Sequence, residues 1–425
     1  MRAADLLRWI AVLSLGAATL YIYRPTYSAS SRVNRPGVET FALAESIVNH
    51  HSFSDPFEAL PTGPSAHTGP LFPAYLALII RVFGHGSIAV GVIMWAASLT
   101  LAVQLMMLPL LAKHLGLGFW TGVLAALAWL AAAIPPTLFA EAQLVGLLVV
   151  AAASFMGTSF TSEMTARQLL MSGILWGALL LLQPVVILVL PFWLLLLHFQ
   201  SPSSLRQKIA LGILPIILVT PWIVRNFVVF HKPVFIRDNL GLELAVSNND
   251  CASFSFEIND ASGCFSQLHP NKSYEEALKV RQLGEVEYNR IRLQEVIQWI
   301  KGNPMAFTSL SLKRFEAFWF PPISNDQGQG VILHPWVLHC LTLLGVAGLF
   351  LMWRNARVAA FVVGLWLAFF PLIYYFVQFY QRYRYPILWV SLLPGCYFIV
   401  ALAEGILGQQ ETQGAPAPIT VSKGT

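Results

Sequence analysis

The segment at residues 87–112, SIAVGVIMWAASLTLAVQLMMLPLLA, decides the fold class because it contains no Asp, Glu, Lys or Arg. A helix of roughly 20 apolar residues spans the ~30 Å hydrocarbon layer of a bilayer, where lipid offers the backbone no hydrogen-bond partners. Comparable apolar segments recur on both sides of it. Together they predict about ten transmembrane helices, at residues 7–24, 87–112, 117–134, 138–158, 168–183, 184–199, 209–227, 334–353, 358–377 and 385–404.

The overall composition agrees with a membrane protein. Hydrophobic residues make up 56% of the chain, charged residues make up 11%, and the mean hydropathy is +0.63. Soluble globular domains contain about 25% charged residues, so an ordinary soluble fold is excluded. We therefore predict an all-α polytopic membrane protein.

The distribution of cations in the short loops predicts the orientation. The first apolar segment has no small-residue cleavage site after it, so we interpret it as a retained anchor and not as a signal peptide. Cations then fall on one side if the N-terminus is cytoplasmic, which places both termini inside. This bias also accounts for the net charge of +5 without a nucleic-acid partner. The cations concerned are Arg2, Arg8, Lys113, Arg167, Arg206, Lys208, Arg354 and Arg357.

This topology leaves two long segments outside the membrane, at residues 25–86 and 228–333, where function is expected. The chain thus divides into an N-terminal membrane module (1–227), an outer loop (228–333), C-terminal membrane helices (334–408) and a disordered cytoplasmic tail (409–425). Within the outer loop, residues 273–300 have a helical pattern, and residues 305–320 form a second, amphipathic helix suited to the membrane interface.

The four cysteines differ in location. Cys340 and Cys396 fall inside predicted spans and are most simply packing residues, whereas Cys251 and Cys264 share the second outer segment. A disulfide between the latter two is plausible in an oxidising compartment, although sequence alone does not show that they are within bridging distance. Asn271 begins a glycosylation sequon, which has meaning only in a host with that machinery.

A carboxylate stands just outside the first apolar segment, in the run NRPGVETFALA at residues 34–44. Glu39 is the acid of this run. A carboxylate held in a partly desolvated pocket has a raised pKa and is suited to act as a general base. The alternative is a solvated loop glutamate with no chemical role.

Several motifs, in this order along the chain, resemble those of the GT-C membrane glycosyltransferases. The chain is similar in particular to bacterial relatives of the protein mannosyltransferase and lipid A aminoarabinose transferase families. The resemblance covers nearly the whole chain and implies a GT-C-like helical bundle. It rests on the run at 34–44, on PTGPSAHTGPLFP (61–73), GILWG (173–177) with Gln183-Pro184, Pro221-Trp222 with Arg225-Asn226, PVFIRDNLGLE (233–243) and RYRYP (382–386).

This resemblance implies transfer of a sugar from a polyprenyl-phosphate donor to a lipid, glycan or protein acceptor at the outer face of a bacterial inner membrane. Glu39 matches the position of the catalytic acid in these families. Many relatives have Asp there with a second acid nearby, whereas Val38 and Thr40 flank a single Glu here. That difference argues against a metal-dependent mechanism, and we expect neither a metal nor another cofactor.

Arginines near the membrane boundary are the candidates for binding the donor phosphate, because guanidinium groups bind phosphate oxygens in a bidentate manner. They are Arg225, Arg237, Arg382 and Arg384. Anchoring at the membrane interface is the alternative for the last two. A cation at the end of an apolar helix, such as Arg225, is costly unless it is paired.

Further polar residues of the outer segments are predicted to line the same pocket. They are Asp55, His67, Glu141, Asn239 and Tyr383. For Asp55 and His67, a turn residue is the simpler account, and for Glu141 an acid at a helix N-terminus is equally consistent with the sequence. The pair His50-His51 lacks further ligands at a diagnostic spacing, so no structural zinc is predicted.

Three other functions fit parts of the sequence. A transporter or flippase would place charges along a pathway inside the membrane and often contains inverted repeats, neither of which is evident here. A ligase or polymerase that moves whole glycans would have a similar topology and similar arginines. A noncatalytic GT-C-like protein also fits, because the acidic pattern is reduced.

Overall fold

The structure is a computed structural model, and it describes residues 3–25, 38–132, 140–322 and 335–413. Helices dominate these residues, and the β-structure named within them is limited to two isolated bridges, Ser54 with Pro64 and Ser255 with Phe379. The prediction of an all-α fold is confirmed.

Seven helices in the described part of the chain are long and apolar enough to cross a membrane. Shorter apolar helices stand beside them at positions where spans were also predicted. The long helices are α1 (Ala3–Ile22), α4 (Ser87–His114), α6 (Ala140–Thr161), α9 (Leu205–Phe230), α16 (Pro335–Asn355), α17 (Arg357–Phe369, continued by η4, Leu372–Tyr375) and α18 (Leu388–Gln413). The shorter ones are α3 (Leu71–Phe83), α5 (Phe119–Ala131), α7 (Ala166–Leu182) and α8 (Leu190–Gln200), the last preceded by η3 (Pro184–Leu188).

Small residues allow close packing of the membrane helices. A Cβ atom added at Gly348 of α16 would lie 1.9 Å from the carbonyl oxygen of Pro394 in α18. Glycine therefore allows these two backbones to touch, as is typical of helix pairs in membranes. Large apolar side chains such as Trp95 and Leu99 are exposed on the outside of the bundle, where lipid would cover them.

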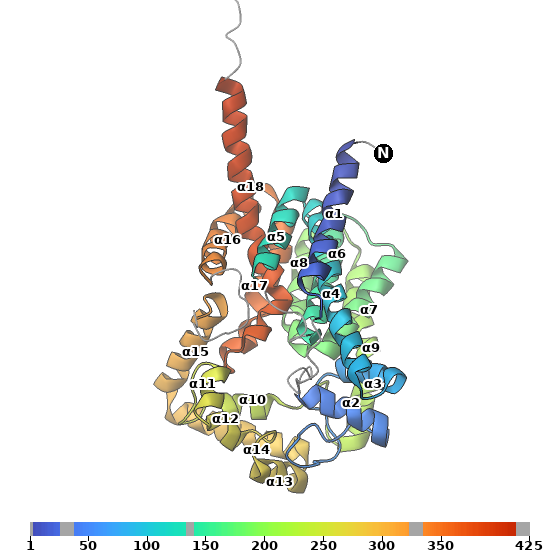
Figure 1. Ribbon diagram of the computed structural model, residues 1–425, viewed down its shortest axis with the longest axis vertical. Coiled ribbons are helices and arrows are strands. Elements are labelled where there is room, and N and C mark those ends of the chain that lie inside the picture. Colours follow the sequence, from blue (N-terminus) through green and yellow to red (C-terminus); the bar gives the residue numbers. More distant parts are fainter. Residues whose placement is uncertain (1–2, 26–37, 133–139, 323–334, 414–425) are drawn as a thin grey trace, which may run out of the picture.

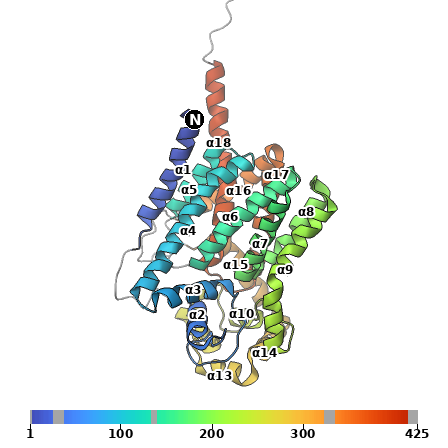
Figure 2. The same ribbon diagram turned by 90° about the vertical axis from the view of Figure 1, so that its right-hand side faces the viewer.

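The outer segments gather at one end of the molecule. In Figures 1 and 2 the short helices of both segments lie towards the end opposite the N-terminus and the end of α18, and α15 (Pro304–Trp319) extends from them towards α16. This arrangement separates a polar end from an apolar bundle. The short helices are α2 (Val38–His50), α10 (Leu240–Ser247), α11 (Phe256–Ala261), α12 (Cys264–Leu268), α13 (Tyr274–Leu283), α14 (Glu285–Gly302) and α15 (Pro304–Trp319).

Three predicted boundaries differ from the structure. The single helical pattern at 273–300 is two helices, because Gly284 adopts a positive φ of 79° that breaks it. The segment before α18 folds as short 3₁₀ turns, η5 (Gln381–Tyr383) and η6 (Tyr385–Ile387), next to Pro386. Helix α18 continues to Gln413, beyond the predicted start of the tail at 409, and the remainder of that tail lies outside the described residues.

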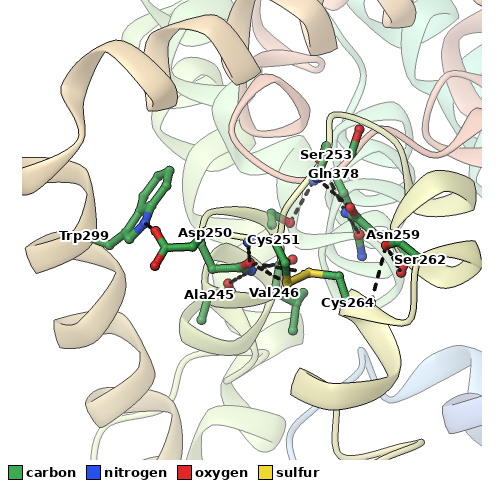
Figure 3. The surroundings of a disulfide bond; sticks show 12 residues. Ala245, Val246, Asp250, Cys251, Ser253, Asn259, Ser262, Cys264, Trp299 and Gln378 are labelled. Atoms are coloured by element: carbon green, nitrogen blue, oxygen red, sulfur yellow. Dashed lines mark hydrogen bonds between the residues drawn. A yellow bond between two sulfur atoms is a disulfide. The ribbon is translucent and has the colours of Figure 1, made fainter.

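Contacts across the second outer segment hold its short helices together. A disulfide joins Cys251 to Cys264, whose Cα atoms are 5.8 Å apart (Figure 3). In the same region the Asn259 side-chain amide donates to Gln378 Oε1 over 2.8 Å, which connects α11 to the chain that precedes η5. Trp299 Nε1 donates to Asp250 Oδ1 over 2.7 Å and attaches α14.

Candidate functional site

A cavity of ≈ 400 Å³ lies between the ends of the membrane helices and the two outer segments. Its walls combine polar residues of the first outer segment, the second outer segment and the chain around η5. The polar lining includes Glu39, His67, Glu141, Gln183, Arg237, Asn239, Glu243, Tyr374, Arg382 and Tyr383, and the apolar lining includes Phe72, Val145, Ile187, Leu188, Leu240, Ile373, Val377 and Pro386. The structure thus brings seven of the ten site residues proposed from sequence to one cavity.

Glu39 lies in the first turn of α2, where the positive end of the helix dipole favours a carboxylate. Its Oε1 atom accepts a hydrogen bond of 3.1 Å from the Asn271 side-chain amide. The carboxylate therefore has one oxygen held by the second outer segment while the residue itself lines the cavity.

A second acid, Glu141, lines the cavity from the first turn of α6. The prolines expected to precede it, at 135 and 136, lie outside the described residues. Glu243 is a third lining acid, and its Oε1 accepts a hydrogen bond of 3.2 Å from the Asn239 side-chain amide. The cavity wall thus contains acids as well as arginines.

Two of the four candidate arginines line the cavity. Arg237 donates from Nε to the carbonyl oxygen of His67 over 3.1 Å, which fixes the plane of its guanidinium group. Arg382 lies over the rings of Tyr380 and Tyr383, with its Cζ atom 4.9 Å and 5.5 Å from their centroids. Aromatic faces attract a guanidinium group by cation–π interaction, and Arg382 also shares a side-chain hydrogen bond with Tyr383.

The other two arginines are engaged by the protein. Arg225 donates to the carbonyl oxygens of Ser65 and Phe53, over 2.8 and 3.0 Å. Arg384 is buried, and its terminal nitrogens donate to backbone carbonyl oxygens and hydroxyl groups of Phe318, Trp319, Thr342 and Ser391. Neither residue lines the cavity, so this arrangement does not support the phosphate-binding role predicted for Arg225 and Arg384.

Asp55 is also placed away from the cavity lining. Its carboxylate accepts hydrogen bonds from the Ser54 hydroxyl group and the Gly63 backbone N–H, over 2.9 and 2.7 Å. Asp55 has a positive φ of 60°, which is typical of an aspartate that shapes a turn. The simpler account of Asp55, as a turn residue, fits these contacts.

Behind the cavity, a junction of five residues joins the two outer segments: Ser65, Ala66, Arg225, Asp238 and Glu285. The Ser65 hydroxyl group and the Ala66 backbone N–H each donate to the Glu285 carboxylate over 2.6 Å. The backbone N–H of Asp238 donates to the carbonyl oxygen of Ala66 over 2.9 Å. This junction positions the loop that contains His67.

Burial raises the pKa of the two acids in the junction. Desolvation raises the pKa of Glu285 to about 8, although its two hydrogen bonds act in the opposite direction. Desolvation likewise raises the pKa of Asp238 to about 6, and one of its carboxylate oxygens is buried without a hydrogen-bond partner. Near neutral pH, Glu285 is therefore largely protonated and neutral.

Glu39, His67 and His269 form the candidate metal cluster, since one ligand atom from each lies within 4.8 Å of the others. Burial lowers the pKa of both histidines, so both are neutral, and the buried Nδ1 of His67 has no hydrogen-bond partner. A carboxylate with two neutral imidazoles is a donor set that zinc accepts.

The protonation of His269 does not fit a preformed metal site. The backbone N–H of Asn271 donates to its Nδ1 over 3.1 Å, so in the neutral ring the proton lies on Nε2. A metal-bound histidine instead donates its other ring N–H to an acceptor. One ring nitrogen of His269 is already occupied and the other is protonated, so binding a metal there would break the bond from Asn271.

Some residues of the site were missed by the sequence analysis. Glu243 and Gln183 stood inside motifs that were noted for other reasons, and the Gln183 side-chain amide bonds to the Tyr374 hydroxyl group. Asn271 was noted for its sequon alone. No signal in the sequence identified Glu285 or His269, because their contacts join segments far apart in the chain.

One comparison with known proteins gives a match in fold. The chain is similar to the crystal structure of the oligosaccharyltransferase of Archaeoglobus fulgidus, which was solved in complex with zinc and sulfate. The TM-score is 0.51 at 14% sequence identity, and the match covers 94% of this chain but 50% of that protein. No known protein family and no curated protein matches the sequence. The match supports the predicted fold, an all-α membrane bundle like that of the oligosaccharyltransferase, and does not support the two bacterial families named above.

Proposed function

We propose that this protein is a membrane glycosyltransferase that moves a sugar from a polyprenyl-phosphate donor to an acceptor within the cavity. One observation carries the proposal: the Glu39 carboxylate and the Arg237 and Arg382 guanidinium groups line one cavity beside the ends of membrane helices. Glycosyl transfer from a lipid phosphate needs a base for the acceptor and cations for the leaving group.

Each group has a defined role in this proposal. Glu39 accepts the proton of the acceptor hydroxyl or amino group as that group attacks the anomeric carbon of the sugar. The bond between this carbon and the phosphate oxygen breaks, and the phosphate leaves with the bonding electron pair. Arg237 and Arg382 stabilise the negative charge that develops on the phosphate.

The apolar part of the lining suits the lipid portion of such a donor. Ile187, Leu188, Ile373 and Val377 line the cavity together with the charged groups. A polyprenyl chain can enter from the bilayer while its phosphate stays at the polar end, because apolar surface favours hydrocarbon over water.

The fold comparison supports this class of reaction, since the matched protein is named an oligosaccharyltransferase. This chain spans half of that protein's length, so its donor and acceptor are proposed from the cavity and not from the match. We include no metal in the reaction, because the protonation of His269 does not fit metal binding in the cluster with Glu39 and His67.

The proposed location is a bacterial inner membrane with the cavity facing outward and both termini in the cytoplasm. Single cysteines at two exposed positions, Ser204 and Asp260, test this orientation in a chain without the free thiols Cys340 and Cys396. We expect an impermeant thiol reagent to label position 260 in intact cells and position 204 after permeabilisation. The opposite pattern would place the cavity in the cytoplasm.

The function is tested by transfer of labelled sugar in proteoliposomes. Defined polyprenyl-phosphate and polyprenyl-diphosphate donors are offered in parallel, with lipid, glycan and peptide acceptors. We expect transfer from at least one monophosphate donor and none by heat-inactivated protein. Movement of the lipid donor across the bilayer without transfer would replace this proposal with a flippase.

A further inference from the structure

We propose that Asn271 is the positioning residue of Glu39, holding its carboxylate through the side chain while its backbone N–H fixes the ring proton of His269. This inference rests on the proposed role of Glu39 as the base. Among the hydrogen bonds of the described residues, Asn271 is the one residue of the second outer segment that binds the Glu39 carboxylate. The second outer segment thus takes part in the reaction through this residue.

The burial of Asn271 argues against the sequon interpretation. The residue is 8% exposed, and both ends of its side-chain amide are engaged. Glycosylation requires an accessible amide nitrogen, whereas the Asn271 nitrogen faces a carboxylate. The residue therefore serves a contact inside the protein.

The orientation of the Asn271 amide is unambiguous. Its Oδ1 accepts a hydrogen bond of 3.1 Å from the backbone N–H of Glu58, and a backbone N–H can act only as a donor. The other end must then be the NH₂ group, which donates to Glu39 Oε1 over 3.1 Å. A flipped amide would lose both bonds, so Asn271 holds one defined oxygen of Glu39.

A short turn holds Asn271 in place. The backbone N–H groups of Lys272 and Ser273 both donate to the carbonyl oxygen of His269, over 3.0 and 2.9 Å. The His269 ring stacks on Phe265, with centroids 4.5 Å apart. Phe265 follows Cys264 of the disulfide, so the turn is anchored to a covalently closed part of the outer segment.

These contacts determine the position of the base and the state of its neighbour. With Oε1 held by Asn271, the acceptor proton is taken by a carboxylate that already has one oxygen in place before substrate binds. With Nδ1 of His269 occupied by the Asn271 N–H, the imidazole beside Glu39 stays neutral with its proton on Nε2. The Nε2 atom of His269 is then a hydrogen-bond donor, so the ring does not act as a second base beside Glu39.

Steady-state kinetics of two variants test the inference. In Asn271→Ala we expect kcat to fall about 10- to 100-fold, because a misplaced group costs up to about this factor, with the donor KM changed less than about twofold. In Asn271→Asp, a second carboxylate faces Glu39, so the acidic limb of the pH–rate profile should move to higher pH. The matched control is Asn303→Asp, at an exposed helix end, which should leave both unchanged.

Infrared titration gives a readout that does not depend on turnover. The difference between wild type and Glu39→Gln isolates the carboxyl band of Glu39, and we expect its titration to move to higher pH in the Asn271→Asp background. An unmoved titration overturns the positioning role even if sugar is transferred. If the wild-type protein transfers no sugar but the Asn271→Asp background shows the shift, the proposed function is refuted and the contact is retained. Loss of thermal stability in Asn271→Ala that accounts for the whole drop in kcat would also overturn the proposal.

Discussion

The cavity and the junction behind it both contain arginine and glutamate side chains, but the surroundings of these side chains differ. In the cavity, Glu39, Arg237 and Arg382 line an open space. In the junction, Arg225 and Glu285 are matched to protein groups, Arg225 by two carbonyl oxygens and Glu285 by a hydroxyl and a backbone N–H. Arginines and acids at the membrane boundary thus divide into those that line the cavity and those that hold the loops.

This division explains why position along the chain is a poor guide to role. Arg382 and Arg384 are two residues apart in one motif, yet Arg382 lines the cavity and Arg384 is buried among acceptors. A buried guanidinium group without partners is costly, whereas a satisfied one stabilises the packing around it. The following predictions test separately the residues that line the cavity and the embedded residues, Arg225, Arg384 and Glu285, whose partners are protein groups.

The largest expected effect is that of Glu39→Gln in the cavity. Removing a general base typically costs about 10²–10⁴ in rate, while the isosteric amide keeps the fold. The matched control is Glu45→Gln on the same helix, where Glu45 lies 3.7 Å from His85. Transfer rates in proteoliposomes check this prediction. Near wild-type turnover by Glu39→Gln would show that Glu39 is not the general base.

A smaller effect is expected for the embedded arginines. Arg225→Ala and Arg384→Ala each leave carbonyl oxygens without donors, at a cost of about 1–3 kcal/mol for a buried unsatisfied group. We expect a lower midpoint of thermal unfolding and an unchanged transfer rate per folded molecule. The control is Arg281→Ala, at an exposed position of α13. A lower transfer rate without a loss of thermal stability would show that these arginines take part in the reaction.

A third effect, spread gradually over several pH units, is the pH dependence of stability from the junction. The folded-state pKa of Glu285 is raised from 4.5 to about 8, so the folded protein holds this proton more tightly than the unfolded chain. The resulting stabilisation is complete below pH 4.5 and is lost as the pH rises towards 8, by up to about 1.4 kcal/mol for each pH unit. Asp238, with its pKa raised to about 6, acts in the same direction at lower pH.

Thermal unfolding between pH 5 and pH 8.5 measures this slope. Glu285→Gln imitates the protonated acid and should flatten the curve, whereas Glu275→Gln at an exposed position of α13 should not. Equal slopes in wild type and Glu285→Gln would show that Glu285 is ionised in the folded protein.

The bundle could be predicted from the sequence because the bilayer imposes a simple rule on composition. Each of the ten predicted spans overlaps a helix in the structure, since a charge-free apolar segment has few other stable arrangements in lipid. The 3₁₀ turns around Arg382 could not be predicted, because they depend on how Pro386 and the tyrosines pack against other helices. A helix start was expected there, with both arginines near the interface.

The candidate site could be predicted in part. Glu39, Arg237 and Arg382 stand in motifs that are recognisable within short stretches of sequence. Asn271 and Glu285 act through partners more than 200 residues away, Glu39 and Ser65 respectively, at separations of 232 and 220 residues. Local patterns contain no information about such pairs, so a structure was needed to find the contacts that hold the base and its loop.

Binding of a labelled short-chain polyprenyl phosphate that has no sugar tests most directly the claim that the cavity binds a lipid phosphate. Equilibrium affinities are compared for wild type, Arg237→Lys, Arg382→Lys and the embedded control Arg384→Lys. A flexible ammonium group does not reproduce the planar fork of arginine, so we expect both cavity variants to bind about 10-fold or more weakly, at about 1–3 kcal/mol for a lost charged hydrogen bond. The control variant should bind like wild type once its folded fraction is taken into account. Equal affinities for all four proteins, or a loss confined to Arg384→Lys, would contradict the phosphate site and with it the proposed reaction.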